Sequence, residues 1–81
     1  MTLAEEGTSP DDAIRSLDRA EATLGKIDRS KLSGESATTY DQANELLQAG
    51  RLAASDQDYV AAAGYAQKAS VLANKLTPAS P

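Results

Sequence analysis

The sequence predicts an all-α protein, a three-helix up-down-up antiparallel bundle. Apolar residues recur at steps of three and four in three separate segments, which is the period of an α-helix with one buried face. Alanine, the strongest helix former, supplies 16 of the 81 residues. The breaks between the segments are short, and short connections make consecutive helices antiparallel neighbours. The heptad-like step of the three apolar stripes favours packing at shallow crossing angles.

The first helix is expected over about residues 10–29. Ser9 can cap its N-terminus, and Pro10 suits the first helical position. Its apolar stripe comprises Ala13, Leu17, Ala20, Leu24 and Ile27. The cations that gather near its far end, where the helix dipole favours positive charge, are Lys26, Arg29 and Lys31. The pair Ser33-Gly34 marks the break before the next helix.

The second helix is expected over about residues 35–54. Its stripe comprises Tyr40, Ala43, Leu47, Gly50 and Ala54. A glycine in the middle of a helix costs about 1 kcal/mol relative to alanine. We expect Gly50 to be compensated by the close approach of a neighbouring backbone.

The third helix is expected over about residues 56–76, with the side chain of Ser55 or Asp56 as its N-terminal cap. Its stripe comprises Tyr59, Ala62, Ala66, Ala69, Ala73 and Leu76. Pro78 ends it, because the residue before a proline is driven out of helical geometry. The closest contact is predicted between the second and third helices.

These helices make up one domain, residues 9–76. Residues 1–8 show no periodicity and are expected to be disordered, and residues 77–81 (T-P-A-S-P) have the composition of a linker. Linker-like ends suggest a piece of a larger protein. The sequence leaves the compartment open: cytoplasmic, or periplasmic if the chain comes from an envelope protein.

Composition argues against catalysis. The chain has no cysteine and no histidine, so the usual thiolate nucleophile, general base and metal ligands are missing. We therefore predict no enzyme, and no catalytic residue, cofactor or metal site. The net charge of −4 without a basic cluster disfavours nucleic acid, and the longest apolar run, residues 60–63, is too short to span a membrane.

Residues 44–76 resemble a single tetratricopeptide repeat, a two-helix unit of about 34 residues. The matching positions are Gly50, Asp58-Tyr59, Ala62, Tyr65, Gln67-Lys68-Ala69 and Leu72. The chain departs from the family pattern in three ways. The large aromatic residue early in the first repeat helix is missing, Ala53 stands where tyrosine is frequent, and the closing proline is displaced to Pro78. The same alanine spacing is similar to alanine-rich helical accessory domains of bacterial envelope proteins.

The resemblance implies a non-catalytic protein–protein interaction module. Repeats of this kind present one face of their first helix to a partner, which here implies the polar side chains of Asn44, Gln48 and Arg51. The alternative interpretation of these three residues is a solvated flank of an ordinary helix. The alternative function is a structural or self-associating helical spacer domain of a bacterial envelope-associated protein, so a homo-oligomer stays open as well as a protein or peptide partner.

Overall fold

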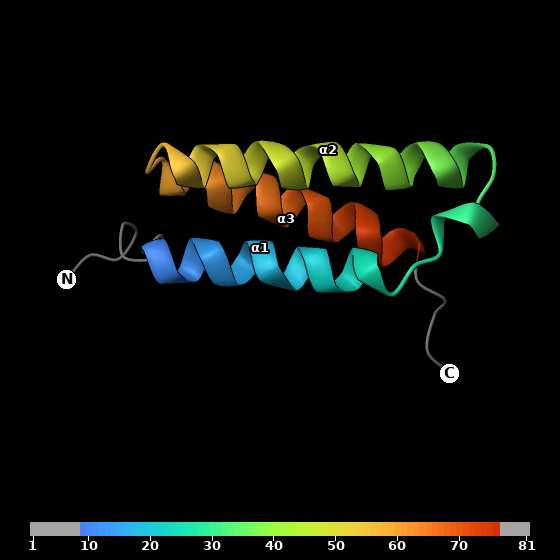
Figure 1. Ribbon diagram of the computed structural model, residues 1–81, viewed down its shortest axis with the longest axis horizontal. Coiled ribbons are helices and arrows are strands. Elements are labelled where there is room, and N and C mark those ends of the chain that lie inside the picture. Colours follow the sequence, from blue (N-terminus) through green and yellow to red (C-terminus); the bar gives the residue numbers. More distant parts are fainter. Residues whose placement is uncertain (1–8, 77–81) are drawn as a thin grey trace.

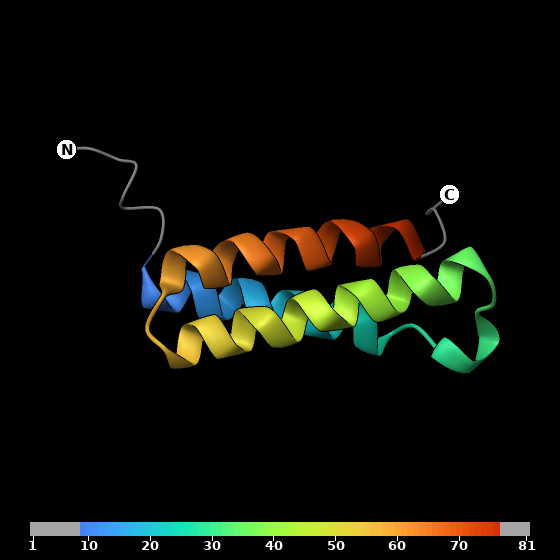
Figure 2. The ribbon, with the colours of Figure 1, turned by 90° about the horizontal axis from the view of Figure 1, so that it is seen from above.

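The computed structural model describes residues 9–76, which form three α-helices and one short 3-10 turn. Helix α1 runs over Pro10–Gly25, α2 over Glu35–Ser55 and α3 over Tyr59–Leu76, and the turn η2 covers Arg29–Lys31. The three helices lie side by side, α2 antiparallel to both α1 and α3 (Figures 1 and 2). This is the predicted all-α, up-down-up three-helix bundle. The segments expected to be disordered or linker-like, 1–8 and 77–81, lie outside the described residues.

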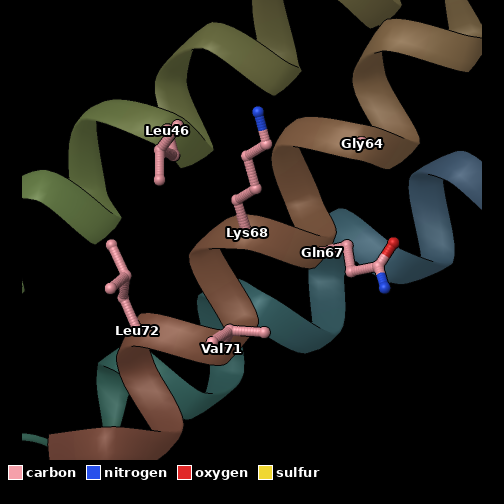
Figure 3. A pocket seen from close by; sticks show the side chains of 6 residues that line it. All are labelled: Leu46, Gly64, Gln67, Lys68, Val71 and Leu72. Carbon is pink, nitrogen blue, oxygen red and sulfur yellow. The ribbon is translucent and has the colours of Figure 1, made fainter.

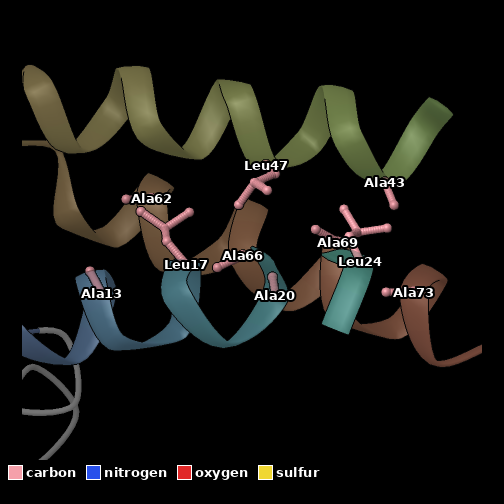
Figure 4. Close-up of a cluster of buried hydrophobic side chains, with 10 residues drawn as sticks. All are labelled: Ala13, Leu17, Ala20, Leu24, Ala43, Leu47, Ala62, Ala66, Ala69 and Ala73. Atoms are coloured by element: carbon pink, nitrogen blue, oxygen red, sulfur yellow. The ribbon is translucent and has the colours of Figure 1, made fainter. Parts of the chain in front are cut away.

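The core lies where the three predicted stripes meet (Figure 4). Three of its ten buried side chains are leucines, and the other seven are alanines. The buried residues are Ala13, Leu17, Ala20, Leu24, Ala43, Leu47, Ala62, Ala66, Ala69 and Ala73. Helix α3 contributes only alanines to this set. Small side chains let the helices approach closely, and α2 and α3 share the most extensive contact, as predicted.

The glycine in the middle of α2 is the point of closest approach. A Cβ atom placed on Gly50 would lie 2.5 Å from Leu17 Cδ2, 3.3 Å from Tyr65 Cβ and 3.4 Å from the carbonyl oxygen of Ala62. The carbonyl oxygen of Ala62 is a backbone atom of α3, so the expected close approach of a neighbouring backbone to Gly50 is present. The tightest contact comes from α1, whose Leu17 side chain occupies the space that a larger residue at position 50 would need.

The predicted end of the first helix, residue 29, is wrong. Helix α1 ends at Gly25, four residues earlier, while its start agrees with the prediction. The Ser9 hydroxyl accepts a hydrogen bond from the Asp12 amide at 3.1 Å and caps the N-terminus. At the other end, the Asp28 carboxylate accepts hydrogen bonds from the amide and hydroxyl of Ser30 and starts the turn η2 instead. Glycine is a poor helix former, so the chain leaves the helix there.

The predicted start of the third helix, residue 56, is also wrong, and so is its predicted cap. Helix α3 begins at Tyr59, and the Asp58 carboxylate accepts a hydrogen bond from the Ala61 amide. Asp56 instead ends α2, where its amide donates to the carbonyl oxygens of Leu52 and Ala53. Between them Gln57 has a φ of 65°, in the left-handed region. This conformation reverses the chain direction, so α3 begins three residues later than predicted.

Candidate functional site

The three residues predicted to bind a partner lie on one flank of α2, the flank that faces α1. Asn44 and Gln48 are exposed, whereas Arg51 is half-buried. The Arg51 Nη2 atom donates hydrogen bonds to Asp18 Oδ1 at 3.0 Å and to Glu21 Oε1, both on α1. These hydrogen bonds raise the pKa of the Arg51 guanidinium, with the contribution of Asp18 the larger. The guanidinium is thus held by α1, and the open part of this flank is reduced to Asn44 and Gln48.

Three ion pairs between different elements were missed by sequence reasoning, because each joins residues that are far apart in the chain. Besides the pairing of Arg51 with α1, Arg29 in the turn η2 holds Asp41 on α2 through two parallel hydrogen bonds, at 2.9 and 3.1 Å. The hydrogen bond from Arg29 lowers the pKa of the Asp41 carboxyl below its ordinary value. This contact fixes the α1–α2 connection against α2.

A shallow apolar groove lies between α2 and α3 (Figure 3). Its lining residues are Leu46, Gly64, Gln67, Lys68, Val71 and Leu72. Leu46 extends from α2 toward α3, while Leu72 and Lys68 extend from α3 toward α2. Gly64 leaves one stretch of the groove floor without a side chain. The space beside it is open, because a Cβ atom placed there would meet nothing within 4 Å. The groove can therefore accept an apolar segment that lies close to the α3 backbone.

The groove has one charged side chain, Lys68, and it belongs to a helix without carboxylates. Helix α3 carries two lysines, Lys68 and Lys75, and no acidic residue, in a chain whose net charge is −4. Among residues 9–76 neither lysine forms an ion pair. The exposed apolar side chains nearby include Val60, which is 71% exposed, and Val71, which is 52% exposed. This surface thus combines apolar area with unopposed positive charge.

A second depression lies between α1 and α3 and is more polar. It is lined by Ser16, Arg19, Ala63, Ala66, Gln67, Ser70 and Asn74. Within residues 9–76 no set of three or more histidine, cysteine or carboxylate side chains is placed to hold a metal ion. No helix of this described part combines the length and the apolar character needed to cross a membrane.

The groove was also missed by sequence reasoning, although two signals for it were present. Gly64 and Val71 both fall off the apolar stripe of the third helix, and each is unusual on a solvated helix face. A mid-helix glycine without compensation and a β-branched residue both lower helix propensity. What the sequence could not supply is the rotation of α2 that places Leu46 beside them.

Comparison with known proteins gives no relative. No family model, no curated protein and no solved structure matches this chain. The groove and the charged side chains described above are the features of the described residues that bear on function.

Proposed function

We propose that this chain is a non-catalytic protein–protein interaction module of tetratricopeptide-like type, part of a larger protein. One observation carries the proposal: the α2–α3 hairpin leaves an apolar groove open on its surface, with Leu46, Val71 and Leu72 around the bare backbone at Gly64. Val71 is exposed, while Leu46 and Leu72 are partly buried against the core, and apolar side chains that reach the surface together are typical of a surface that contacts another protein. Five of the six residues that line the groove belong to α3 and one to α2, so we propose an amphipathic helix of the partner that lies along α3 beside Leu46.

The tetratricopeptide-like resemblance supports the same class of function but a different surface. It implies binding through Asn44, Gln48 and Arg51, and Arg51 is already paired with Asp18 and Glu21. We therefore propose the groove as the main contact, with Asn44 and Gln48 as a secondary polar surface.

The test is selection of helical peptides from a displayed random library against the wild-type domain. We expect apolar amphipathic sequences that lose binding to Val71→Glu and to Leu46→Glu, because either substitution places a charge in the groove. The double substitution Asn44→Ala/Gln48→Ala should weaken their binding less than either groove substitution, because these two residues supply only the secondary polar surface. Far-UV circular dichroism of each variant establishes that the domain remains folded.

Two results would count against the proposal. Selection that enriches no peptide would refute an interaction surface on this domain. Peptides that bind Val71→Glu normally, but not the Asn44→Ala/Gln48→Ala variant, would move the interaction to the polar flank of α2.

A further inference from the structure

The depression between α1 and α3 differs in chemistry from the groove that carries the proposed function. Its volume is about 440 Å³, toward the lower end of the roughly 300–1,000 Å³ that ligand pockets span. Its polar side chains come from both helices: Ser16 and Arg19 from α1, and Gln67, Ser70 and Asn74 from α3. Ala63 and Ala66 complete the lining with methyl groups. We refer to these seven residues as the α1–α3 depression.

The one charged side chain in this lining, Arg19, has a free guanidinium. Among residues 9–76 it forms no ion pair and donates no hydrogen bond. The carboxylates nearest to it along α1, Asp18 and Glu21, form ion pairs with Arg51 of α2 instead. Asp12 lies two turns earlier, about 10 Å along the helix axis, and α3 contains no acidic residue. The depression therefore presents a positive charge that no carboxylate of the described residues neutralises.

The neutral polar groups of the lining can donate hydrogen bonds as well. Ser16 and Ser70 are half-buried, and in the described part of the chain neither hydroxyl forms a hydrogen bond. The amide group of Gln67 adds two further donors. No lining residue is a carboxylate, whose oxygens could only accept. A ligand with acceptor oxygens and a negative charge therefore complements this set of groups.

We propose that the α1–α3 depression binds a carboxylate of a polypeptide, with the Arg19 guanidinium as its charged contact. A planar guanidinium meets a carboxylate through two parallel hydrogen bonds, and its single charge balances that of the carboxylate. A phosphate monoester carries about −1.5 to −2 at pH 7, which one guanidinium does not balance. The methyl groups of Ala63 and Ala66 offer apolar contact to the aliphatic part of a glutamate or of a C-terminal residue, which a phosphate lacks.

This site is additional to the groove of the proposed function. Gln67 is the one residue that lines both, and its side chain extends away from Leu46 (Figure 3). The two surfaces can therefore be tested separately.

Short peptides test the site directly, through a titration of the isotope-labelled domain followed by amide chemical shifts. An N-acetylated, C-amidated Gly-Glu-Gly peptide supplies a side-chain carboxylate, and N-acetylated Gly-Gly-Ala with a free C-terminus supplies a chain-end carboxylate. Their neutral counterparts are the same peptides with glutamine in place of glutamate and with an amidated C-terminus. We expect at least one carboxylate peptide to bind with a Kd of about 1–10 mM, because one guanidinium at the surface is a weak anchor.

The amide signals that shift should belong to the lining residues of both helices, and the neutral counterpart should bind at least about fivefold more weakly. Which of the two carboxylate peptides binds more tightly identifies the source of the carboxylate as a side chain or a chain end.

Substitutions of two arginines of α1 separate the depression from the general charge of the helix. Arg19→Gln should weaken binding of the carboxylate peptide at least about fivefold, because it removes the charge and the paired donors. Arg15→Gln is the matched control, since Arg15 is exposed, lies one turn earlier and is not part of the lining. It should weaken binding by no more than about twofold, because a more distant exposed charge is screened. Arg19→Lys keeps the charge without the planar fork and should give an intermediate affinity.

Three results would overturn the proposal. The first is a pair of carboxylate peptides that bind no better than their neutral counterparts. The second is an equal loss of affinity in Arg15→Gln and Arg19→Gln, and the third is inorganic phosphate that binds more tightly than either carboxylate peptide. The proposed function survives each of them, because its helical peptides depend on Leu46 and Val71, which lie outside the depression.

Discussion

Replacing Gly50 by alanine should destabilise the bundle even though alanine is the better helix former. The added methyl group would lie 2.5 Å from Leu17 Cδ2, whereas carbon atoms in favourable contact lie about 3.5–4.0 Å apart. Leu17 must therefore retreat by about 1 Å. Its side chain is 0% exposed, so that movement displaces other core atoms. The contacts at Tyr65 Cβ and the Ala62 carbonyl, 3.3 and 3.4 Å, close the alternative direction of relaxation.

The magnitude follows from two opposing effects. Overpacking a tightly packed core costs about 1–3 kcal/mol, and replacing a mid-helix glycine by alanine gains about 1 kcal/mol. The free energy of unfolding of Gly50→Ala should thus fall by about 0–2 kcal/mol. In a domain whose core rarely supplies more than about 3–5 kcal/mol, this is a large fraction of the total.

Gly64→Ala is the matched control, because it is the same substitution in the middle of a helix with nothing within 4 Å of the new methyl group. It should raise the free energy of unfolding by about 0.8–1 kcal/mol. The difference between the two variants cancels the helix-propensity gain and isolates the overpacking cost of about 1–3 kcal/mol.

The assay is urea denaturation followed by far-UV circular dichroism, with both variants at the same low micromolar concentration so that self-association does not contribute. In thermal melts, each kcal/mol of difference should appear as about 4–8 °C between the two midpoints. Equal stabilisation of the protein by Gly50→Ala and Gly64→Ala would refute the claim that α1, α2 and α3 are in close contact at Gly50.

Three further predictions concern the polar contacts. Asp58→Ala should lower the free energy of unfolding by about 1 kcal/mol in urea denaturation, because it removes the cap of α3, while Asp56→Ala should change it little; the reverse ranking would contradict the observed cap. Arg51→Met should cost no more than about 1 kcal/mol, as exposed ion pairs do, and its deficit relative to wild type should shrink as salt is added; a deficit insensitive to salt would exclude the pairing with α1. The pKa of Asp41 is depressed in the folded state, so the stability that it contributes is present above its ordinary value of 3.8 and is lost as pH falls through the lower folded value. Carboxyl NMR titration should therefore give Asp41 a lower midpoint in wild type than in Arg29→Gln, and equal midpoints would refute the ion pair.

The core was predictable because the helical period alone identifies it. The stripe from Ala13 to Leu24 is buried as expected, and so are the central residues of the other two stripes, among them Leu47 and Ala66. Periodicity reports which side of each helix is apolar, and in an antiparallel bundle of three such helices these sides face a common core. The start of α1 was predictable for a related reason, since the Ser9 cap and Pro10 are local signals.

The two errors in helix ends have a common cause. The cations after Gly25 favour a helix C-terminus, and Asp56 is a competent cap, so local sequence permits a longer first helix and an earlier third one. Local signals thus permit more than one boundary, and the structure uses a different one at each of these two ends. Arg29 is used to hold Asp41 on α2, and the reversal at Gln57 leaves Asp58 as the first residue placed to cap α3.

The candidate site was less predictable than the core, because a surface depends on how the helices are rotated relative to one another. Asn44, Gln48 and Arg51 do share a flank of α2, as their spacing indicates. Predicting that Asp18 and Glu21 hold Arg51 would have required the position of α1 relative to α2. Predicting the groove would have required knowing that Leu46 of α2 and Gly64 of α3 line the same surface.

The most direct test of the central claim, that small residues bring the three helices together at Gly50, is a nuclear Overhauser measurement on the wild-type protein. A strong cross-peak is expected between the δ-methyl protons of Leu17 and the α protons of Gly50, because the Cδ2 atom lies where a Cβ of residue 50 would be crowded. A fully assigned spectrum of the folded domain that lacks this cross-peak would contradict the account.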